Sequence, residues 1–167
     1  MTRTIALLSI AVLAGCTTTP TSVTPGNTRP LQGENQMIRT GGCFCGNIRY
    51  EITGVPLHET VCHCAGCRRS SGSGSVPWIT VKTSDFKLTQ GELAEVRSDK
   101  YPRTTCDGCG GVRVFCPNCG TPIAFRGDGR AERETDITVG SLDDPENFSP
   151  KEDVFAKQRL PWVALLK

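Results

Sequence analysis

The chain has 167 residues, of which 10 are cysteine, 18 glycine and 11 proline, and aromatic residues make up only 6%. This length leaves room for one domain with a small apolar core, and such cores are commonly supplemented by disulfides or structural metal. The formal net charge is +2 and the basic residues are scattered among the acids apart from the pair Arg68 and Arg69, which excludes the basic face that nucleic acid requires.

The first 16 residues are typical of a targeting segment. Arg3 supplies a positive charge, and the apolar run from Ile5 to Ala14 is too short to span a bilayer as a mature helix. Leu13-Ala14-Gly15-Cys16 resembles the cleavage site of a bacterial lipoprotein. We therefore expect Cys16 to become a lipidated first residue that attaches the protein to a membrane on its periplasmic or cell-surface side. The alternative is a true start at Met37, which would give a cytoplasmic protein.

Residues 17–36 are rich in Thr, Pro, Ser, Gly and Asn, a composition that predicts a disordered polar tether. Residues 37–167 show short alternating runs separated by Gly, Pro, Asn and Asp, without a long helical period, and this pattern predicts one all-β domain. Residues 70–75 are expected to form a flexible loop, and residues 143–147 a turn or a single helical turn. Strands are expected at residues 48–53, 76–81, 86–89, 94–97, 112–115, 123–125, 136–139 and 153–156.

Nine of the ten cysteines lie in this domain, in close groups. One or two intervening residues let a tight turn aim two sulfurs at one ion, whereas a disulfide between such neighbours would be strained. The spacing therefore favours metal over disulfides. Adjacent glycines suit a chain that wraps a metal with positive φ, and they are Gly46, Gly66, Gly108, Gly110 and Gly120. The groups are Cys43-x-Cys45, Cys62-x-Cys64-x-x-Cys67, Cys106-x-x-Cys109 and Cys116-x-x-Cys119.

The cysteine inventory predicts two zinc ions in the domain. Two pairs of cysteines make a closed tetrahedral site, whereas a trio makes a site with an open fourth position. One zinc is therefore expected to be structural and the other reactive. The spacing alone does not say which pairs share an ion.

Three of the motifs resemble, in order, the signatures of the glutathione-dependent formaldehyde-activating (GFA) enzyme family, whose zinc domain is similar to that of centromere protein V. The ending Val139-Gly140-Ser141-Leu142-Asp143-Asp144-Pro145 and Pro161-Trp162 also resembles the family. The resemblance implies a small zinc-stapled, β-tent-like fold built from short antiparallel sheets. The three motifs are Gly41-Gly42-Cys43-Phe44-Cys45-Gly46, Cys62-His63-Cys64-Ala65-Gly66-Cys67-Arg68 and Phe115-Cys116-Pro117-Asn118-Cys119-Gly120-Thr121.

The resemblance also implies how the cysteines are shared. The first and last motifs would hold the structural zinc through Cys43, Cys45, Cys116 and Cys119, and the middle motif would hold the second zinc through Cys62, Cys64 and Cys67. One ion closing a loop of about seventy residues would constrain the unfolded chain heavily. Cys106 and Cys109 depart from the family pattern. They can compete for Cys116 and Cys119, form a third metal site or a redox pair, or be loop thiols without a required role.

An open zinc held by three thiolates has a net charge of about −1 and is a weak Lewis acid, so a soft thiol suits its fourth position better than water. The resemblance implies a carbon–sulfur lyase that adds glutathione to formaldehyde or a related aldehyde, giving S-hydroxymethylglutathione, and that catalyses the reverse. Arg68, or Arg69, would help electrostatically by meeting a glutathione carboxylate or the developing alkoxide. The alternative for each arginine is a solvated surface charge.

Other side chains near the motifs have plainer interpretations. His63 lies between two cysteines and is expected to point away from the metal and to satisfy a backbone carbonyl. His58 has no motif around it. Four aromatic residues are expected to lie in the core or to cover the sheet rather than to bind substrate, and these are Tyr50, Trp78, Phe125 and Trp162.

The competing hypothesis is a zinc module without catalytic activity that binds a protein or a thiol ligand, because resemblance transfers a fold more safely than an activity. Nucleic acid is not expected as a partner. Removal of residues 1–16 takes away one Arg, so that 18 basic and 17 acidic residues leave a charge of +1.

Overall fold

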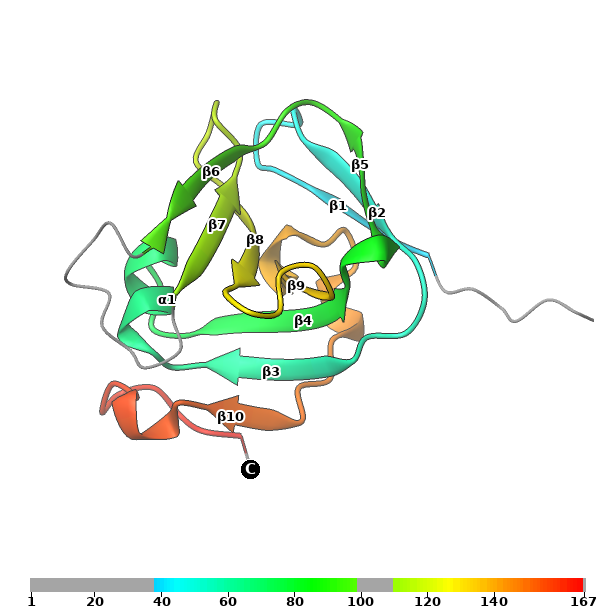
Figure 1. Ribbon diagram of the computed structural model, residues 1–167. Coiled ribbons are helices and arrows are strands. Elements are labelled where there is room, and N and C mark those ends of the chain that lie inside the picture. Colours follow the sequence, from blue (N-terminus) through cyan, green and yellow to red (C-terminus); the bar gives the residue numbers. More distant parts are fainter. Residues whose placement is uncertain (1–37, 99–109, 167) are drawn as a thin grey trace, which may run out of the picture. The chain divides into compact units, whose positions relative to one another are not determined.

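The computed structural model describes residues 38–98 and 110–166 (Figure 1). Within these residues the chain forms β-strands, one α-helix and short 3-10 turns, which confirms the all-β prediction. The targeting segment with Cys16, the tether and the pair Cys106 and Cys109 lie outside the described residues. Among the described helices none is long and apolar enough to cross a membrane.

The strands form two sheets. The smaller sheet has the order β1-β2-β5, and the larger has the order β10-β3-β4-β9-β8-β7-β6. Neighbouring strands are antiparallel, except that β10 runs parallel to β3. We expected antiparallel sheets, and the larger sheet is instead mixed. The elements are β1 Arg39–Gly42, β2 Arg49–Ile52, β3 His58–Cys62, α1 Ala65–Ser71, β4 Val76–Lys82, β5 Phe86–Gln90, β6 Ala94–Arg97, β7 Gly111–Phe115, β8 Pro122–Gly127, β9 Glu134–Thr138 and β10 Glu152–Val154.

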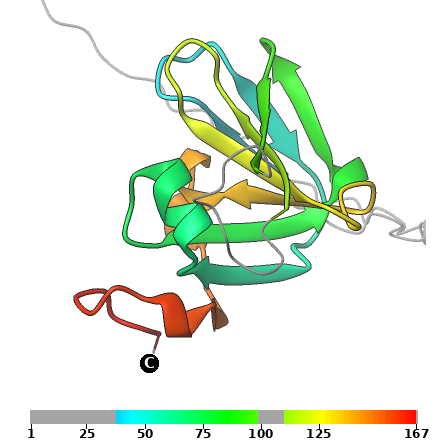
Figure 2. The same cartoon turned by 60° about the vertical axis from the view of Figure 1, so that its left-hand side comes forward.

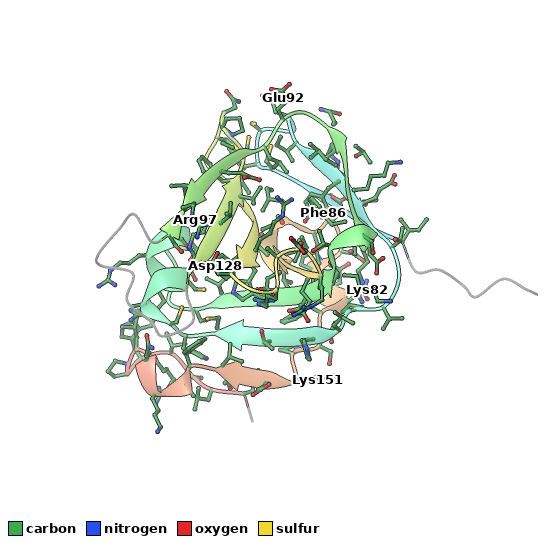
Figure 3. The ribbon with its side chains drawn as sticks, in the orientation of Figure 1. Lys82, Phe86, Glu92, Arg97, Asp128 and Lys151 are labelled. Atoms are coloured by element: carbon green, nitrogen blue, oxygen red, sulfur yellow. The ribbon has the colours of Figure 1, made fainter. Side chains whose placement is uncertain are left out.

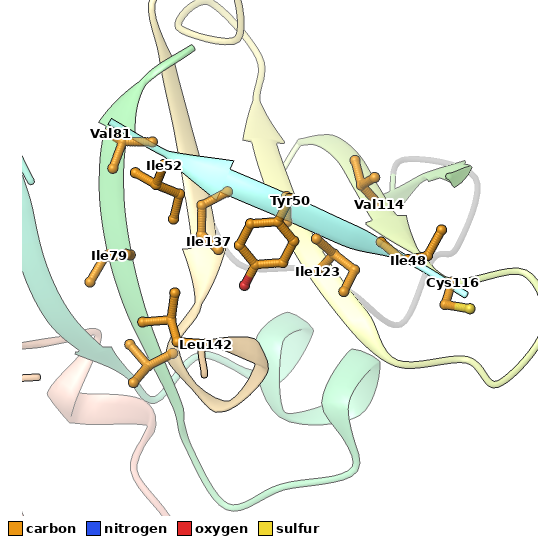
Figure 4. Packing of buried hydrophobic residues seen from close by; sticks show 12 residues of the cluster. Ile48, Tyr50, Ile52, Ile79, Val81, Val114, Cys116, Ile123, Ile137 and Leu142 are labelled. Carbon is orange, nitrogen blue, oxygen red and sulfur yellow. The ribbon is translucent and has the colours of Figure 1, made fainter. Parts of the chain in front are cut away.

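The main core lies between the two sheets, because the small sheet leans across one face of the larger one (Figures 1 and 2). Every second residue points into this core along β2 and the position before it. These residues are Ile48, which precedes the strand, and Tyr50 and Ile52 within it. They meet Ile79 of β4 and Ile137 of β9 (Figure 4). All five side chains are at most 1% exposed. Burial of this apolar surface is the main stabilising contribution of the fold.

Tyr50 is the largest side chain in this core. Its hydroxyl forms a hydrogen bond of 2.7 Å with Ser141 Oγ, and its ring lies 5.3 Å from that of Phe86. Burial raises the pKa of Tyr50, so the hydroxyl stays neutral. β1 passes so close that a Cβ on Gly41 would collide with the Tyr50 ring and the Ser141 carbonyl. The tyrosine therefore requires a glycine opposite it.

The two faces of the larger sheet have different roles. On β4, Ile79 and Val81 face the main core, whereas Val76 and Trp78 point to the opposite face. There they belong to a second buried cluster that contains Cys62 and the other two cysteines of the middle motif. The strand period of two thus places the cysteine trio on the side of the sheet away from the main core.

Each predicted strand overlaps a strand of the structure, and the turn at residues 143–147 contains the 3-10 turn Pro145–Asn147. β1, β3 and α1 were not predicted, and the helix takes up the first residues of the expected loop at 70–75. Tyr50, Trp78 and Phe125 are buried as expected, but Trp162 is 74% exposed and so does not lie in the core, one of the two positions expected for it.

Exposed charged side chains such as Lys82 and Lys151 lie at the periphery of the sheets (Figure 3). Some of them form ion pairs, including Arg97 with Asp128 at 3.0 Å. Both members of this pair are more than 40% exposed, and such surface pairs contribute little to stability.

Candidate metal centres and reaction pocket

Four cysteines come together where the turn between β1 and β2 meets the turn between β7 and β8. Their sulfurs all lie within 4.8 Å of one another. The Cys43 and Cys45 sulfurs are 3.4 Å apart, and the Cys45 and Cys116 sulfurs 3.8 Å. A tetrahedron with Zn–S bonds near 2.3 Å places its sulfurs about 3.8 Å apart. This four-cysteine cluster, Cys43, Cys45, Cys116 and Cys119, therefore fits one zinc ion.

Each half of the four-cysteine cluster is a tight turn closed by a glycine. The amide of Gly46 donates to the Cys43 carbonyl at 3.1 Å, and that of Gly120 donates to the Cys116 carbonyl at 2.9 Å. Both glycines have positive φ, +79° and +76°, as expected for a chain that wraps a metal. The Ile48 amide also donates to the Cys43 sulfur at 3.2 Å. The two turns and this amide thus fix the positions of the sulfurs relative to the backbone.

The thiols of the four-cysteine cluster have different environments. The Thr121 hydroxyl, 3.1 Å from the Cys119 sulfur, and backbone amides together lower the pKa of Cys119 to about 5, whereas burial raises the pKa of Cys116 to about 11. The Asn118 side-chain amide donates to the Cys45 sulfur at 3.2 Å. Because zinc binds the thiolate rather than the thiol, these hydrogen bonds favour metal binding at neutral pH.

The three cysteines of the middle motif form a separate group, here called the trio. Cys62 ends β3, Cys64 precedes α1 and Cys67 lies in its first turn. Their sulfurs lie within 4.8 Å of one another, and the residues are 4%, 0% and 6% exposed. The Cys64 sulfur caps the helix by accepting a hydrogen bond of 3.3 Å from the Cys67 amide. The short helix therefore fixes two of the three sulfurs relative to each other.

Contacts within the trio shift the pKa values of its thiols in opposite directions. Hydrogen bonds from Cys62 and Cys67 lower the pKa of the Cys64 thiol. Hydrogen bonds with Cys64 and Cys67, together with burial, raise the pKa of Cys62. A divalent cation that binds the trio would displace the thiol protons and take up all three sulfurs. The residues present fit a tri-thiolate zinc site.

Beside the trio is a pocket of about 340 Å³ lined by all three cysteines. Part of its wall is one row of cross-strand neighbours on the larger sheet. Thr80 of β4 pairs with Asp136 of β9, which pairs with Phe125 of β8, which pairs with Arg113 of β7. His58 of β3 continues the row next to Thr80. Five strands therefore supply hydroxyl, aromatic, acidic and basic groups to the pocket beside the trio.

The charged groups of this row have different environments. Asp136 is 8% exposed and accepts hydrogen bonds from Thr80 Oγ1 at 2.7 Å and from the guanidinium of Arg130. Arg113 instead lies with its guanidinium carbon 4.7 Å from the centre of the Phe125 ring and with Nη2 3.9 Å from the Cys67 sulfur. The carboxylate is thus neutralised within the protein, while the Arg113 charge faces the trio.

His63 has a different partner from the one expected. The residue is fully buried and points away from the trio pocket, but its Nε2 is paired with the Asp153 carboxylate at 2.6 Å and not with a backbone carbonyl. Its own amide donates to the Val154 carbonyl at 3.0 Å. β10 therefore supports the loop that carries the trio, as groups behind a metal ligand commonly do.

The structure places Arg68 and Arg69 differently from Arg113. Arg68 Nε donates to the His63 carbonyl at 3.2 Å. Arg69 lines a neighbouring, mainly apolar cavity of about 410 Å³ but not the trio pocket, whereas Arg113 lines both. The catalytic role predicted for Arg68 stays a prediction. Arg113 belongs to no cysteine motif, and only the strand pairing of β7 with β8 brings it to the trio.

Comparison with known proteins agrees with this geometry. The fold resembles a crystal structure of a Rhodobacter sphaeroides protein, with a TM-score of 0.50 and 21% identity over 69% of this chain and 99% of that chain. The family model described as glutathione-dependent formaldehyde-activating enzyme matches residues 38–158. That range contains both cysteine groups and the pocket row. The chain therefore belongs to the glutathione-dependent formaldehyde-activating enzyme family.

Proposed function

We propose that this protein is a zinc-dependent carbon–sulfur lyase that adds glutathione, or another small thiol, to formaldehyde or a related aldehyde and catalyses the reverse cleavage. The observation that carries the proposal is the trio beside its pocket. Three buried sulfurs converge at the wall of a cavity of about 340 Å³, so a fourth ligand can approach from that cavity. Family membership supports the same type of reaction.

The residues of the pocket suit this chemistry. A zinc ion on three thiolates would lower the pKa of a bound thiol while leaving its sulfur nucleophilic. Cys62, Cys64 and Cys67 would hold that ion, and their burial keeps bulk water from their sulfurs. Trp78 and Phe125 add apolar walls, which strengthen electrostatic interactions inside the pocket.

The reaction is tested by mixing the zinc-loaded protein with glutathione and ¹³C-formaldehyde and following adduct formation by NMR. The spontaneous rate without protein is the baseline, and Cys64→Ala removes one trio sulfur. We expect a rate above the baseline that the variant loses. Equal rates for the two proteins would exclude catalysis by the trio. If glutathione then still binds the wild-type protein, the trio belongs to a zinc module without catalytic activity.

We further propose two zinc ions per chain, one in the trio and one in the four-cysteine cluster, where it is structural. The convergence of two separate sulfur groups supports this stoichiometry. Elemental analysis of the purified protein should give about two zinc per chain, and about one in Cys64→Ala. A wild-type protein with one ion or none would contradict the proposal.

A further inference from the structure

Arg113 has an unusual set of contacts for an arginine within a sheet. Its Nη2 lies 3.9 Å from the Cys67 sulfur, and its guanidinium carbon is 4.7 Å from the Phe125 ring centre. Its Nε is buried and has no hydrogen-bond partner in the described part of the chain. A buried donor without a partner is costly, and in Arg113, unlike other arginines of the sheet, this donor belongs to a guanidinium that also contacts a trio sulfur.

The donor without a partner, Nε, shares one edge of the side chain with Nη2, whose acceptor is the Cys67 sulfur. Nε and Nη2 form the edge of the planar guanidinium that binds two oxygens of an anion side by side. A contact of 3.9 Å with sulfur is long for a charge-assisted hydrogen bond. Nη2, which lies beside Cys67 where Arg113 lines the pocket, therefore keeps donor capacity for an oxygen that enters from the pocket.

The position of Arg113 decides which oxygen of the reactants it can meet. On the proposed function, the substrate sulfur takes the position beside Cys67. In the adduct the former carbonyl oxygen is two bonds from that sulfur, whereas the carboxylates of glutathione are several bonds further away. A donor that already touches the Cys67 sulfur is placed for the nearer oxygen.

We propose that Arg113 is a catalytic residue that binds the aldehyde oxygen as it becomes an alkoxide. The inference rests on the proposed function. In the step, a carbon–sulfur bond forms, the π bond of the carbonyl breaks and its electron pair moves to oxygen. Arg113 donates hydrogen bonds to this oxygen but keeps its own proton, because a guanidinium does not deprotonate in proteins. The thiol proton leaves to solvent, and solvent returns one to the alkoxide.

A binding experiment tests the inference without turnover. Two small thiols are titrated into cobalt(II)-substituted protein, whose absorption reports thiolate binding. Mercaptoacetate carries an anionic oxygen close to its sulfur, and 2-mercaptoethanol carries a neutral one. We expect the wild-type protein to prefer mercaptoacetate by about tenfold or more, as for a charged hydrogen bond, and Arg113→Met to lose that preference.

Arg126→Met is the matched control. Arg126 lies on the neighbouring strand β8, opposite Val112, and its Nε is likewise buried without a partner among the described residues. It pairs with Glu95 at 3.0 Å and is outside the trio pocket. This variant should keep the wild-type preference. Arg113→Lys keeps the charge without the fork and should show a smaller preference than wild type.

Three results would overturn the inference. They are a wild-type protein without the preference, an Arg113→Met variant that keeps it, and an equal weakening of both thiols, which would mean that Arg113 only balances the charge of the trio. If Arg113→Met fails to bind cobalt, an unchanged preference in Arg113→Lys decides against the inference. The proposed function is separable. If the wild-type protein forms no adduct but Arg113→Met loses the thiol preference, the reaction is refuted and Arg113 is only a binding group for an anionic oxygen. If the wild-type protein forms the adduct, Arg113→Met should lower kcat about 100-fold.

Discussion

The zinc proposed for the four-cysteine cluster should stabilise the fold chiefly by joining distant parts of the chain. Cys45 and Cys116 are 71 residues apart in sequence, yet their sulfurs approach to 3.8 Å. The perturbation is the double substitution Cys43→Ser and Cys45→Ser, which removes one end of this link. Cys45 is exposed and Cys43 partly buried, so little core packing is lost. The comparison is Cys64→Ser in the trio.

The loop-entropy relation used for cross-links gives the expected magnitude. A closed loop of 71 residues corresponds to about 4 kcal/mol, whereas the short loop from Cys62 to Cys67 corresponds to about 2 kcal/mol. The double variant should therefore lose about 4 kcal/mol of unfolding free energy in the presence of zinc. With an m-value of about 2 kcal/mol per molar urea, the midpoint should fall by about 2 M.

The assay is urea unfolding of each protein with zinc and again with a strong chelator and a reductant. Chelation should remove most of the difference between wild type and the double variant, because without metal the link is absent from both proteins. A difference of the same size in chelator would show that the serines act through lost packing. Equal midpoints with zinc would show that the four-cysteine cluster does not hold the fold together.

Three further predictions concern the core, the surface and the N-terminus. Gly41→Ala should lower stability by about 1–3 kcal/mol, because its Cβ would collide with a buried tyrosine ring and a carbonyl. The control Gly140→Ala, whose Cβ would meet nothing within 4 Å, should be tolerated. Equal melting temperatures for the two variants would refute the predicted collision. The hydrogen bond from Arg49 lowers the pKa of Asp143 to about 2. This exposed ion pair should therefore stabilise the fold by about 1 kcal/mol or less above about pH 4, and this stabilisation should be lost toward pH 2. Asp143→Asn should thus lower the urea midpoint at neutral pH but not near pH 2, and an equal effect at both would contradict the assignment. We propose that Cys16 is the lipidated first residue of the mature protein, and mass spectrometry of the N-terminus should find it acylated; an unmodified start at another residue would exclude the anchor.

Strands with alternating apolar residues were predictable because one of their faces is buried in the main core. Residues 76–81 illustrate this, since Ile79 and Val81 recur with a period of two on that face. β3 was not predictable in the same way. Its sequence His-Glu-Thr-Val-Cys alternates weakly, and its burial comes from contact with β4 and β10 rather than from an apolar face.

The helix α1 was missed for a different reason. It has seven residues, which is too short to show the helical period in the sequence. Its start is set by the Cys64 cap and its end by Gly72, which has a φ of +69°. Both are local features of a chain that wraps a metal, and the sequence pattern had assigned part of this segment to a loop.

The cysteine groups could be inferred because their chemistry is encoded by local spacing, but the pocket row could not. Arg113, Phe125 and Asp136 come from three strands, and only the register between these strands places them side by side. No short motif records such a register.

The fold also separates stability from chemistry. The four-cysteine cluster adjoins the main core, whereas the trio and its pocket lie on the other face of the larger sheet. A change at Arg113 or Phe125 therefore alters the pocket without opening the core between the sheets. If the two zinc ions are placed as proposed, the trio can lose its metal and its activity while the protein stays folded, and loss of the other ion should unfold both sites together.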